Sequence, residues 1–340
     1  MGINEFLKVI LEWIYGFVGN YGWAVVLFTL LVRLIVMPFD YKSRVGMRKM
    51  QKIAPMQAKI QKKYEKDPDK MNKKLQELYR EQRVNPLSSC LPMLISLPIL
   101  FAMFTAMRMV ANEHLAQQAF DIIASGNPAL DSWLWVKNVW MPDSPFAAVW
   151  PNLDSLRQIA TNEWLAVFNK LPQETLALLA DKGLALTAES FAGDALNTTI
   201  QTIYTTMEQL PAYMEHVKYY SDLAIPLFNI HIFVNYNGYF ILPILAAGGQ
   251  FLMTKLTGTA QTPAADDAQA QQAQNSMKFM NYFFPIFTLI LCFNYNAIFA
   301  LYCVAANVIA IVQTKGINMY LDRKEALEAA NPNKNTGSLK

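Results

Sequence analysis

The sequence predicts an all-α integral membrane protein: a five-span helical bundle with a polar groove, an N-terminal interfacial helix and a cytoplasmic helical hairpin. Of its 340 residues, 53% are hydrophobic and only 16% are charged, whereas an average soluble protein has roughly 25% charged residues. The apolar residues fall in blocks that approach the ~20 residues a helix needs to cross a bilayer. The lysine and arginine residues are concentrated between the first two apolar blocks, which indicates how the chain is oriented in the membrane.

The first 19 residues are predicted to form an amphipathic helix that lies in the membrane interface, over 1–19. Its apolar stripe recurs at spacings of four, three and four residues: Phe6, Ile10, Trp13 and Phe17. The stretch has neither the basic start nor the small-residue cleavage site of a signal peptide. The alternative interpretation is a short first membrane span.

Five segments have the length and composition of membrane spans: 22–39, 87–110, 238–256, 279–293 and 297–314. The second contains Pro92 and Pro98. The last two are separated by a short polar turn, which predicts a tight antiparallel pair of helices. The segments between and after them are expected to be loops and a tail: 40–86, 111–237, 257–278 and 315–340.

The charges of these loops predict the orientation. Loop 40–86 has fourteen lysine and arginine residues against six acidic ones, a net charge of +8, while loop 111–237 has five against thirteen, a net charge of −8. Short basic loops stay in the cytoplasm. We therefore expect a multi-pass protein of the bacterial plasma membrane, with the N-terminus and the acidic loop outside and the C-terminus in the cytoplasm.

The basic loop 40–86 is predicted to be an antiparallel helical hairpin. The turn 67–69, Asp-Pro-Asp, separates two stretches with apolar residues at helical spacing. These residues are Met56, Ile60 and Tyr64 before the turn, and Met71, Leu75, Leu78 and Tyr79 after it. The cationic faces have two open interpretations: a solvated surface that fixes topology, or a docking surface for lipid headgroups, ribosomal RNA or an acidic protein.

Arg33 is the residue that most directly suggests a function. It lies deep in the first span, where an arginine costs ~2.5–3.5 kcal/mol on insertion scales and cannot lose its proton. The five spans contain no acidic residue, so we predict a hydrated groove open to the cytoplasm. Its candidate lining residues are Arg33, Thr29, Ser96, Gln250, Thr254, Asn307 and Gln313. The alternative is that Arg33 snorkels to the cytoplasmic headgroups.

The sequence predicts no catalytic, cofactor or metal site. It contains no nucleophile elbow, zinc-protease motif, Walker loop or dinucleotide fingerprint. The three histidines are scattered without metal-ligand spacing, and all three cysteines lie in apolar runs. An intramembrane enzyme would need paired titratable groups in the spans, so we expect that the protein is not an enzyme.

Several motifs resemble the YidC-type membrane protein insertases. The resemblance rests on residues 20–23, 29–33 and 37–38 in the first span, 84–92 and 97–99 around the second, 133–135 and 142–143 after it, and 242–245 in the third. It implies a protein that inserts nascent membrane proteins into the bilayer, alone or beside the Sec channel. It also implies that Arg33 is the family's membrane arginine, that Thr29 is its groove threonine, and that the hairpin and the C-terminal tail engage the ribosome and targeting machinery.

The chain departs from this pattern in three places. Ser96 stands where a glutamine is common, and 294–297 replaces a proline-containing turn. Residues 145–236 have no recognised counterpart, and we expect a small acidic extracellular helical domain there, with a helical pattern over 198–220. The resemblance further suggests a member without the large N-terminal periplasmic domain.

The functional hypothesis is therefore an insertase and chaperone that moves short hydrophilic tails of client proteins through the groove and releases their helices into lipid. The main alternative is a small-solute transporter or channel, which would be expected to show inverted repeats that this sequence lacks. A scaffold that only assembles complexes is a second alternative.

Overall fold

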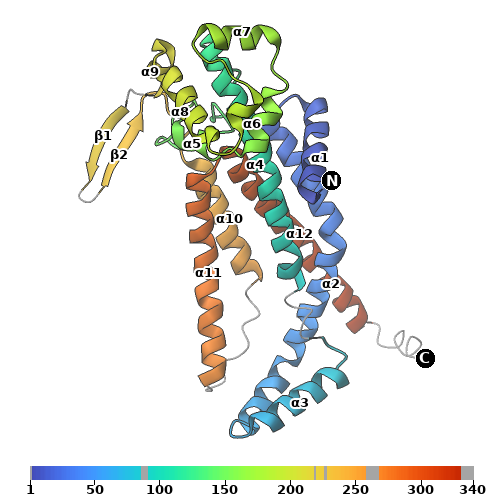
Figure 1. Ribbon diagram of the computed structural model, residues 1–340. Helices are drawn as coiled ribbons and strands as arrows, with labels where there is room; N and C mark the ends of the chain where they lie inside the picture. The colour runs from blue at the N-terminus through green and yellow to red at the C-terminus, as the bar shows by residue number, and fades with distance from the viewer. Residues whose placement is uncertain (1, 86–90, 218–219, 226–227, 258–267, 331–340) are drawn as a thin grey trace. The chain divides into compact units, whose positions relative to one another are not determined.

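The computed structural model describes residues 2–85, 91–217, 220–225, 228–257 and 268–330 (Figure 1). The long helices are α1 Ile3–Val18, α2 Tyr21–Lys63, α3 Pro68–Glu81, α4 Leu91–Ser125, α10 Ile241–Thr257, α11 Ala268–Asn294 and α12 Ala297–Ala330. Between α4 and α10 lie α5 Leu153–Arg157, α6 Thr161–Phe168, α7 Gln173–Asp181, the 3-10 helix η2 Ala188–Phe191, α8 Ala195–Glu208, α9 Pro211–Val217 and the strands β1 Tyr220–Ile225 and β2 Phe228–Phe233. The predicted helical character is confirmed.

The residues form two compact units. Unit 1 contains Met1–Phe28, Phe101–Ala247 and Thr288–Val304, and unit 2 contains Thr29–Leu100, Gly248–Phe287 and Ala305–Lys340. Helices α2, α4, α10, α11 and α12 contribute residues to both units. The predicted acidic loop lies in unit 1, and the predicted groove residues and basic hairpin lie in unit 2.

The segment between α4 and α10 is a small domain built on the end of α4. Phe120 of α4 meets Trp164 of α6 with ring centroids 5.6 Å apart, and Trp164 stacks on Phe191 at 5.7 Å. All three rings are buried. Nearby, Asn112 of α4 donates a hydrogen bond of 2.6 Å to the Glu163 carboxylate. The predicted helical domain therefore has a hydrophobic core that includes α4.

The segment expected to be a small helical domain also contains two strands, because β1 and β2 form an antiparallel ribbon after its last helix (Figure 1). Tyr220 pairs with Phe233 and Ile225 with Phe228. Helix α9 stops at Val217, and the following sequence is rich in β-branched and aromatic residues that favour strands. The helical pattern read over 198–220 corresponds to α8 and α9, separated by a break before Pro211.

A buried polar network joins the tryptophan-rich segment 133–150 to the start of α10. The buried Asp143 carboxylate accepts hydrogen bonds from the Tyr239 and Leu242 backbone N–H groups, at 2.9 and 2.7 Å, and from the Trp135 indole. A Cβ atom on Gly238 would lie 2.0 Å from Asp143, so only glycine fits beside this carboxylate. The motif pair 133–135 and 142–143 thus positions the N-terminus of α10.

The basic segment folds as two helices with a turn, as predicted (Figure 1). Asp67 caps α3 by accepting a hydrogen bond from the Lys70 N–H at 3.1 Å. Met71 and Leu78 are buried, in agreement with the predicted stripe on α3. The predicted stripe on α2 is wrong at Met56, which is 45% exposed, while Ile53 is buried.

Several helices run past the ends of the predicted spans. Helix α2 is continuous over 22–39 and on to Lys63, and α12 extends beyond residue 314 to Ala330. Among the described residues, α2 and the Ala297–Leu327 part of α12 are long and apolar enough to cross a membrane, which alone is a weak indication. The limits of the five spans stay predictions from the sequence.

Large apolar side chains are exposed along these helices. They include Leu34 and Ile35 on α2, Ile244 on α10, and Phe279 and Ile286 on α11, each more than half exposed. Soluble monomers rarely expose contiguous apolar patches of large area. Helix α1 also exposes its predicted stripe at Phe6, Trp13 and Phe17 while it buries Leu11 and Ile14; its place in the membrane interface stays a prediction.

Candidate functional site

Arg33 lies partly buried on α2, one turn after the fully buried Thr29. Within the part of the chain that the structure describes, no carboxylate forms a salt bridge with the Arg33 guanidinium. Asp40 lies two turns further along α2, and its carboxylate interacts electrostatically with Arg33 and Arg44. Asp40 stands just outside the predicted span, and no residue that the structure describes forms a direct ion pair with Arg33.

Gln313 is the candidate residue that contacts Arg33 directly. Its side-chain amide donates a hydrogen bond of 3.0 Å to the Arg33 backbone carbonyl, which ties α12 to α2. The amide oxygen of Gln313 is buried and accepts no hydrogen bond from any described residue. Such an atom is normally served by water.

The candidates on α10 and α12 lie where these helices come close together. A Cβ atom on Gly249, next to Gln250, would lie 3.0 Å from the Cβ of Asn307. Asn307 is buried, and Thr254 donates a hydrogen bond of 2.8 Å to the Gln250 backbone carbonyl of its own helix. The side chain of Ser96 lies outside the described residues. Six of the seven candidates can therefore be placed, all in unit 2.

The contact between α2 and α12 continues beyond Arg33 as a row of polar pairs. Arg44 donates a short hydrogen bond to the hydroxyl of the buried Thr314. Arg48 donates to the Asn318 backbone carbonyl at 3.0 Å. We call the whole set the polar track: Arg33, Arg44, Arg48 and Lys52 on α2, and Gln313, Thr314, Asn318, Asp322 and Glu325 on α12.

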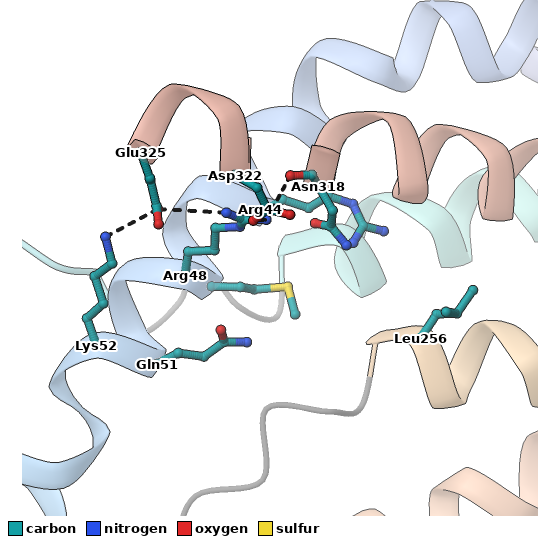
Figure 2. A pocket seen from close by; sticks show the side chains of 9 residues that line it. Arg44, Arg48, Gln51, Lys52, Leu256, Asn318, Asp322 and Glu325 are labelled. Atoms are coloured by element: carbon teal, nitrogen blue, oxygen red, sulfur yellow. Dashed lines mark hydrogen bonds and ion pairs between the residues drawn. The ribbon is translucent and has the colours of Figure 1, made fainter. Parts of the chain in front are cut away.

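Three salt bridges close the far end of the polar track (Figure 2). Arg48 lies 2.7 Å from the Asp322 carboxylate and 3.8 Å from that of Glu325. Lys52 lies 3.2 Å from the same Glu325 oxygen. These pairs border a cavity of about 490 Å³, which is also lined by Arg44, Met47, Gln51, Leu256 and Asn318.

Sequence reasoning missed the part of the polar track beyond Arg33. The signal was present, because Arg44, Arg48 and Lys52 recur every fourth residue and so share one face of a helix. On α12, Thr314, Asn318 and Asp322 have the same spacing. The sequence predicts 315–340 only as a tail, and it gives no indication that residues of this segment pair with residues of α2.

The polar track has a second buried atom without a partner. The Nε atom of Arg44 is buried and donates no hydrogen bond to any described residue. The Arg44 Nε donor and the Gln313 oxygen acceptor are thus both buried along the contact between α2 and α12. Leaving such groups dry costs about 1–3 kcal/mol each, which favours water in the polar track.

These features define a class: a helical membrane protein with a cationic polar track along two of its helices. The family description "60Kd inner membrane protein" matches residues 13–180 and 198–324. The chain therefore belongs to this family, the YidC-type membrane proteins. The match extends well into the segment that had no recognised counterpart, and leaves out only 181–197 of it.

Related proteins agree with the family assignment. The membrane protein insertase YidC of Wolinella succinogenes is 47% identical over 98 residues, which cover 29% of this chain and 18% of that protein. The YidC of Caldanaerobacter subterraneus is 43% identical over 106 residues, covering 31% of this chain and 52% of the relative. The YidC of Helicobacter pylori strain 26695 is 41% identical over 96 residues. The chain thus spans from about a fifth to about half of the length of these relatives.

Proposed function

We propose that the protein is a membrane protein insertase and chaperone of the plasma membrane. Its five spans would be 22–39, 87–110, 238–256, 279–293 and 297–314, with the N-terminus outside and the C-terminus in the cytoplasm. A hydrated groove that contains Arg33 would receive short hydrophilic tails of nascent membrane proteins. The groove would be lined by Thr29, Ser96, Gln250, Thr254, Asn307 and Gln313.

The observation that supports this proposal is that the Arg33 guanidinium forms no salt bridge with any described residue, while Gln313, which contacts Arg33, has a buried amide oxygen that no described residue hydrogen-bonds. A charge in that position needs water or a ligand, and a groove supplies both. The names of the relatives, which are membrane protein insertases, support the same function. The exposed apolar side chains of α2, α10 and α11 provide a surface along which a client helix could contact lipid.

Insertion in this mechanism is a catalysed partition that needs no covalent chemistry and no cofactor. A hydrophilic tail must cross ~30 Å of hydrocarbon, and a groove that reaches partway shortens the dry path. Arg33 attracts acidic groups of the tail into the groove. Burial of the client's apolar helix in lipid, at about 25 cal/mol per Å², then drives transfer to completion.

The cytoplasmic hairpin and the C-terminal tail would bring clients to the groove. The hairpin 40–86 has a net charge of +8, which suits the RNA of a ribosome or the targeting machinery. We propose that the protein works either alone or beside the Sec channel, with the bilayer as its other partner.

Substitution of Arg33 tests the mechanism. Arg33→Ala should lower insertion of clients with acidic tails about tenfold, the factor that ~1.4 kcal/mol of lost attraction makes. Arg33→Lys should keep most of the activity because the positive charge remains. The measurement is complementation of an insertase-depleted strain, together with pulse-labelled insertion of clients with acidic or neutral tails. Full activity of Arg33→Ala on acidic tails would remove the charge from the mechanism.

Reconstitution separates insertion from the rival functions. The purified protein in liposomes should insert a small single-span client without any other protein, which a scaffold would not do. A solute transporter would instead produce substrate-dependent flux across the same liposomes. A photocrosslinker at position 33 should trap nascent chains of membrane proteins.

A further inference from the structure

The far end of the polar track holds three cations and two carboxylates beside a cavity of about 490 Å³. The cations Arg44, Arg48 and Lys52 come from α2, and the carboxylates of Asp322 and Glu325 come from α12 (Figure 2). All five residues belong to unit 2. The proposed function involves the segments that carry these residues only through the overall charge of the hairpin 40–86, and it gives none of the five side chains a role of its own.

The two sides of these salt bridges differ in exposure. The Arg48 side chain is only 20% exposed, whereas those of Asp322 and Glu325 are 69% and 42% exposed. The cation is therefore fixed and largely removed from solvent, while its acidic partners remain in water. Exposed ion pairs contribute little stability because water and salt compete with them. A different carboxylate can thus replace Asp322 or Glu325 at small cost.

Arg48 is also held in place by the protein independently of the two acids. Its guanidinium donates to the Asn318 carbonyl at 3.0 Å. Arg44, one turn earlier, is anchored to Thr314 and keeps a buried Nε without a partner among the described residues. Arg44 and Arg48 would keep their positions if the acids moved away, so these two cations form a preformed carboxylate-binding site with an internal occupant.

We propose that Arg44, Arg48 and Lys52 bind the acidic residues of a client's hydrophilic tail before these residues reach Arg33, and that Asp322 and Glu325 of α12 are internal competitors that the tail displaces. This inference rests on the proposed function, since it adds an entry site to the same route. The ligand class is a carboxylate-bearing peptide. The cavity supplies space for such a segment, and Met47 and Leu256 provide apolar contact beside the charges.

The internal carboxylates also give selectivity. A tail without acidic residues cannot replace the salt bridges of Asp322 and Glu325, and it leaves the site closed. A tail with carboxylates replaces the salt bridges of Asp322 and Glu325 with ion pairs of its own, and it thereby opens the site. Removal of the internal acids should therefore tighten binding of acidic peptides and leave neutral peptides unaffected.

The test uses the full-length protein in detergent and a short aspartate-rich peptide, with the same peptide carrying asparagine at each aspartate as the reference. The double variant Asp322→Asn, Glu325→Gln should bind the acidic peptide about fivefold more tightly, as expected from the loss of exposed competing ion pairs. Glu81→Gln, on an exposed acid outside the cavity, should leave the affinity unchanged. Unchanged or weaker binding by the double variant would overturn the proposal.

Loss of the cations should have the opposite effect. Arg48→Gln should weaken binding of the acidic peptide about tenfold and reduce its salt dependence, since Arg44 and Lys52 remain, while Lys49→Gln, on an exposed neighbour, should do neither. Lys52→Gln, on a side chain that is 66% exposed, serves as the second variant should Arg48→Gln fail to fold. Wild-type affinity in Lys52→Gln and in folded Arg48→Gln would refute the site.

The two proposals fail in different measurements. If purified protein binds the peptide as described but inserts no client in liposomes, the entry site stands and the insertase function fails. If insertion proceeds but none of these substitutions changes the affinity for the peptide, the insertase function is supported and the entry site is refuted.

Discussion

At the scale of single residues, Asp143 and Arg33 differ in how their polar atoms are paired. Asp143 in unit 1 is fully buried and accepts hydrogen bonds from two backbone N–H groups and an indole. Its charge is satisfied by donors and therefore serves the structure. Arg33 in unit 2 has no such partner among the described residues, which makes it a candidate for function.

Asp143→Ala should destabilise the protein by about 3 kcal/mol, because three donors lose an ionised acceptor and two of them begin a helix. The measurement is thermal unfolding of the purified protein in detergent. Asp194→Asn is the matched control, since Asp194 is exposed and its side chain makes no capping hydrogen bond. Equal melting temperatures for wild type and Asp143→Ala would contradict the assigned role.

His114 in unit 1 makes the stability of the fold depend on pH. The ring stacks on Trp140 at 4.2 Å, and burial lowers the pKa of His114 despite the opposing charges of Asp131 and Glu113. Because the folded-state pKa lies below the usual value, the neutral ring stabilises the fold at neutral pH, and this contribution is lost as pH falls through the folded-state pKa. The melting temperature should decrease between about pH 7 and pH 5, and His114→Gln should remove part of that decrease.

At the scale of elements, one close helix contact in the candidate site involves a glycine. Gly249 on α10 faces Asn307 on α12 at a distance that leaves little room for a side chain, whereas a Cβ on Gly248 would meet nothing within 4 Å. Sequence reasoning chose Asn307 and Gln250 because they are polar residues in apolar spans. It could not identify Gly249, because the need for glycine at this position comes from the close approach of α12, which the sequence alone does not show.

Gly249→Val should destabilise the protein by about 1–3 kcal/mol, the usual cost of overpacking a close contact. Gly248→Val places the same side chain one residue away in open space, and it should be close to neutral. The two melting temperatures in detergent give the comparison. A larger loss for Gly248→Val than for Gly249→Val would mean that α10 and α12 do not meet in this way.

At the scale of the whole molecule, the sequence predicted the helical class, the hairpin turn at Asp67 and the helical domain after α4, because each has a local cause in periodicity or capping. It missed the β1–β2 ribbon, whose short strands form their ladder by pairing with each other. It also missed the pairing of Arg48 with Asp322, which are 274 positions apart in the chain. Charge spacing gave a hint of that pairing, but only the fold brings the two helices together.

The continuity of α2 has a mechanical consequence. The helix carries both Arg33 and the basic residues up to Lys63 on one rod of 43 residues, or about 64 Å at 1.5 Å per residue. Pro38 and Pro55 lie inside it, and each lacks the N–H that would stiffen the rod at that point. A load applied at the hairpin is therefore expected to bend α2 first at these prolines, and because Pro38 lies between the hairpin and Arg33, the basic residues can follow a docked partner while Arg33 keeps its place.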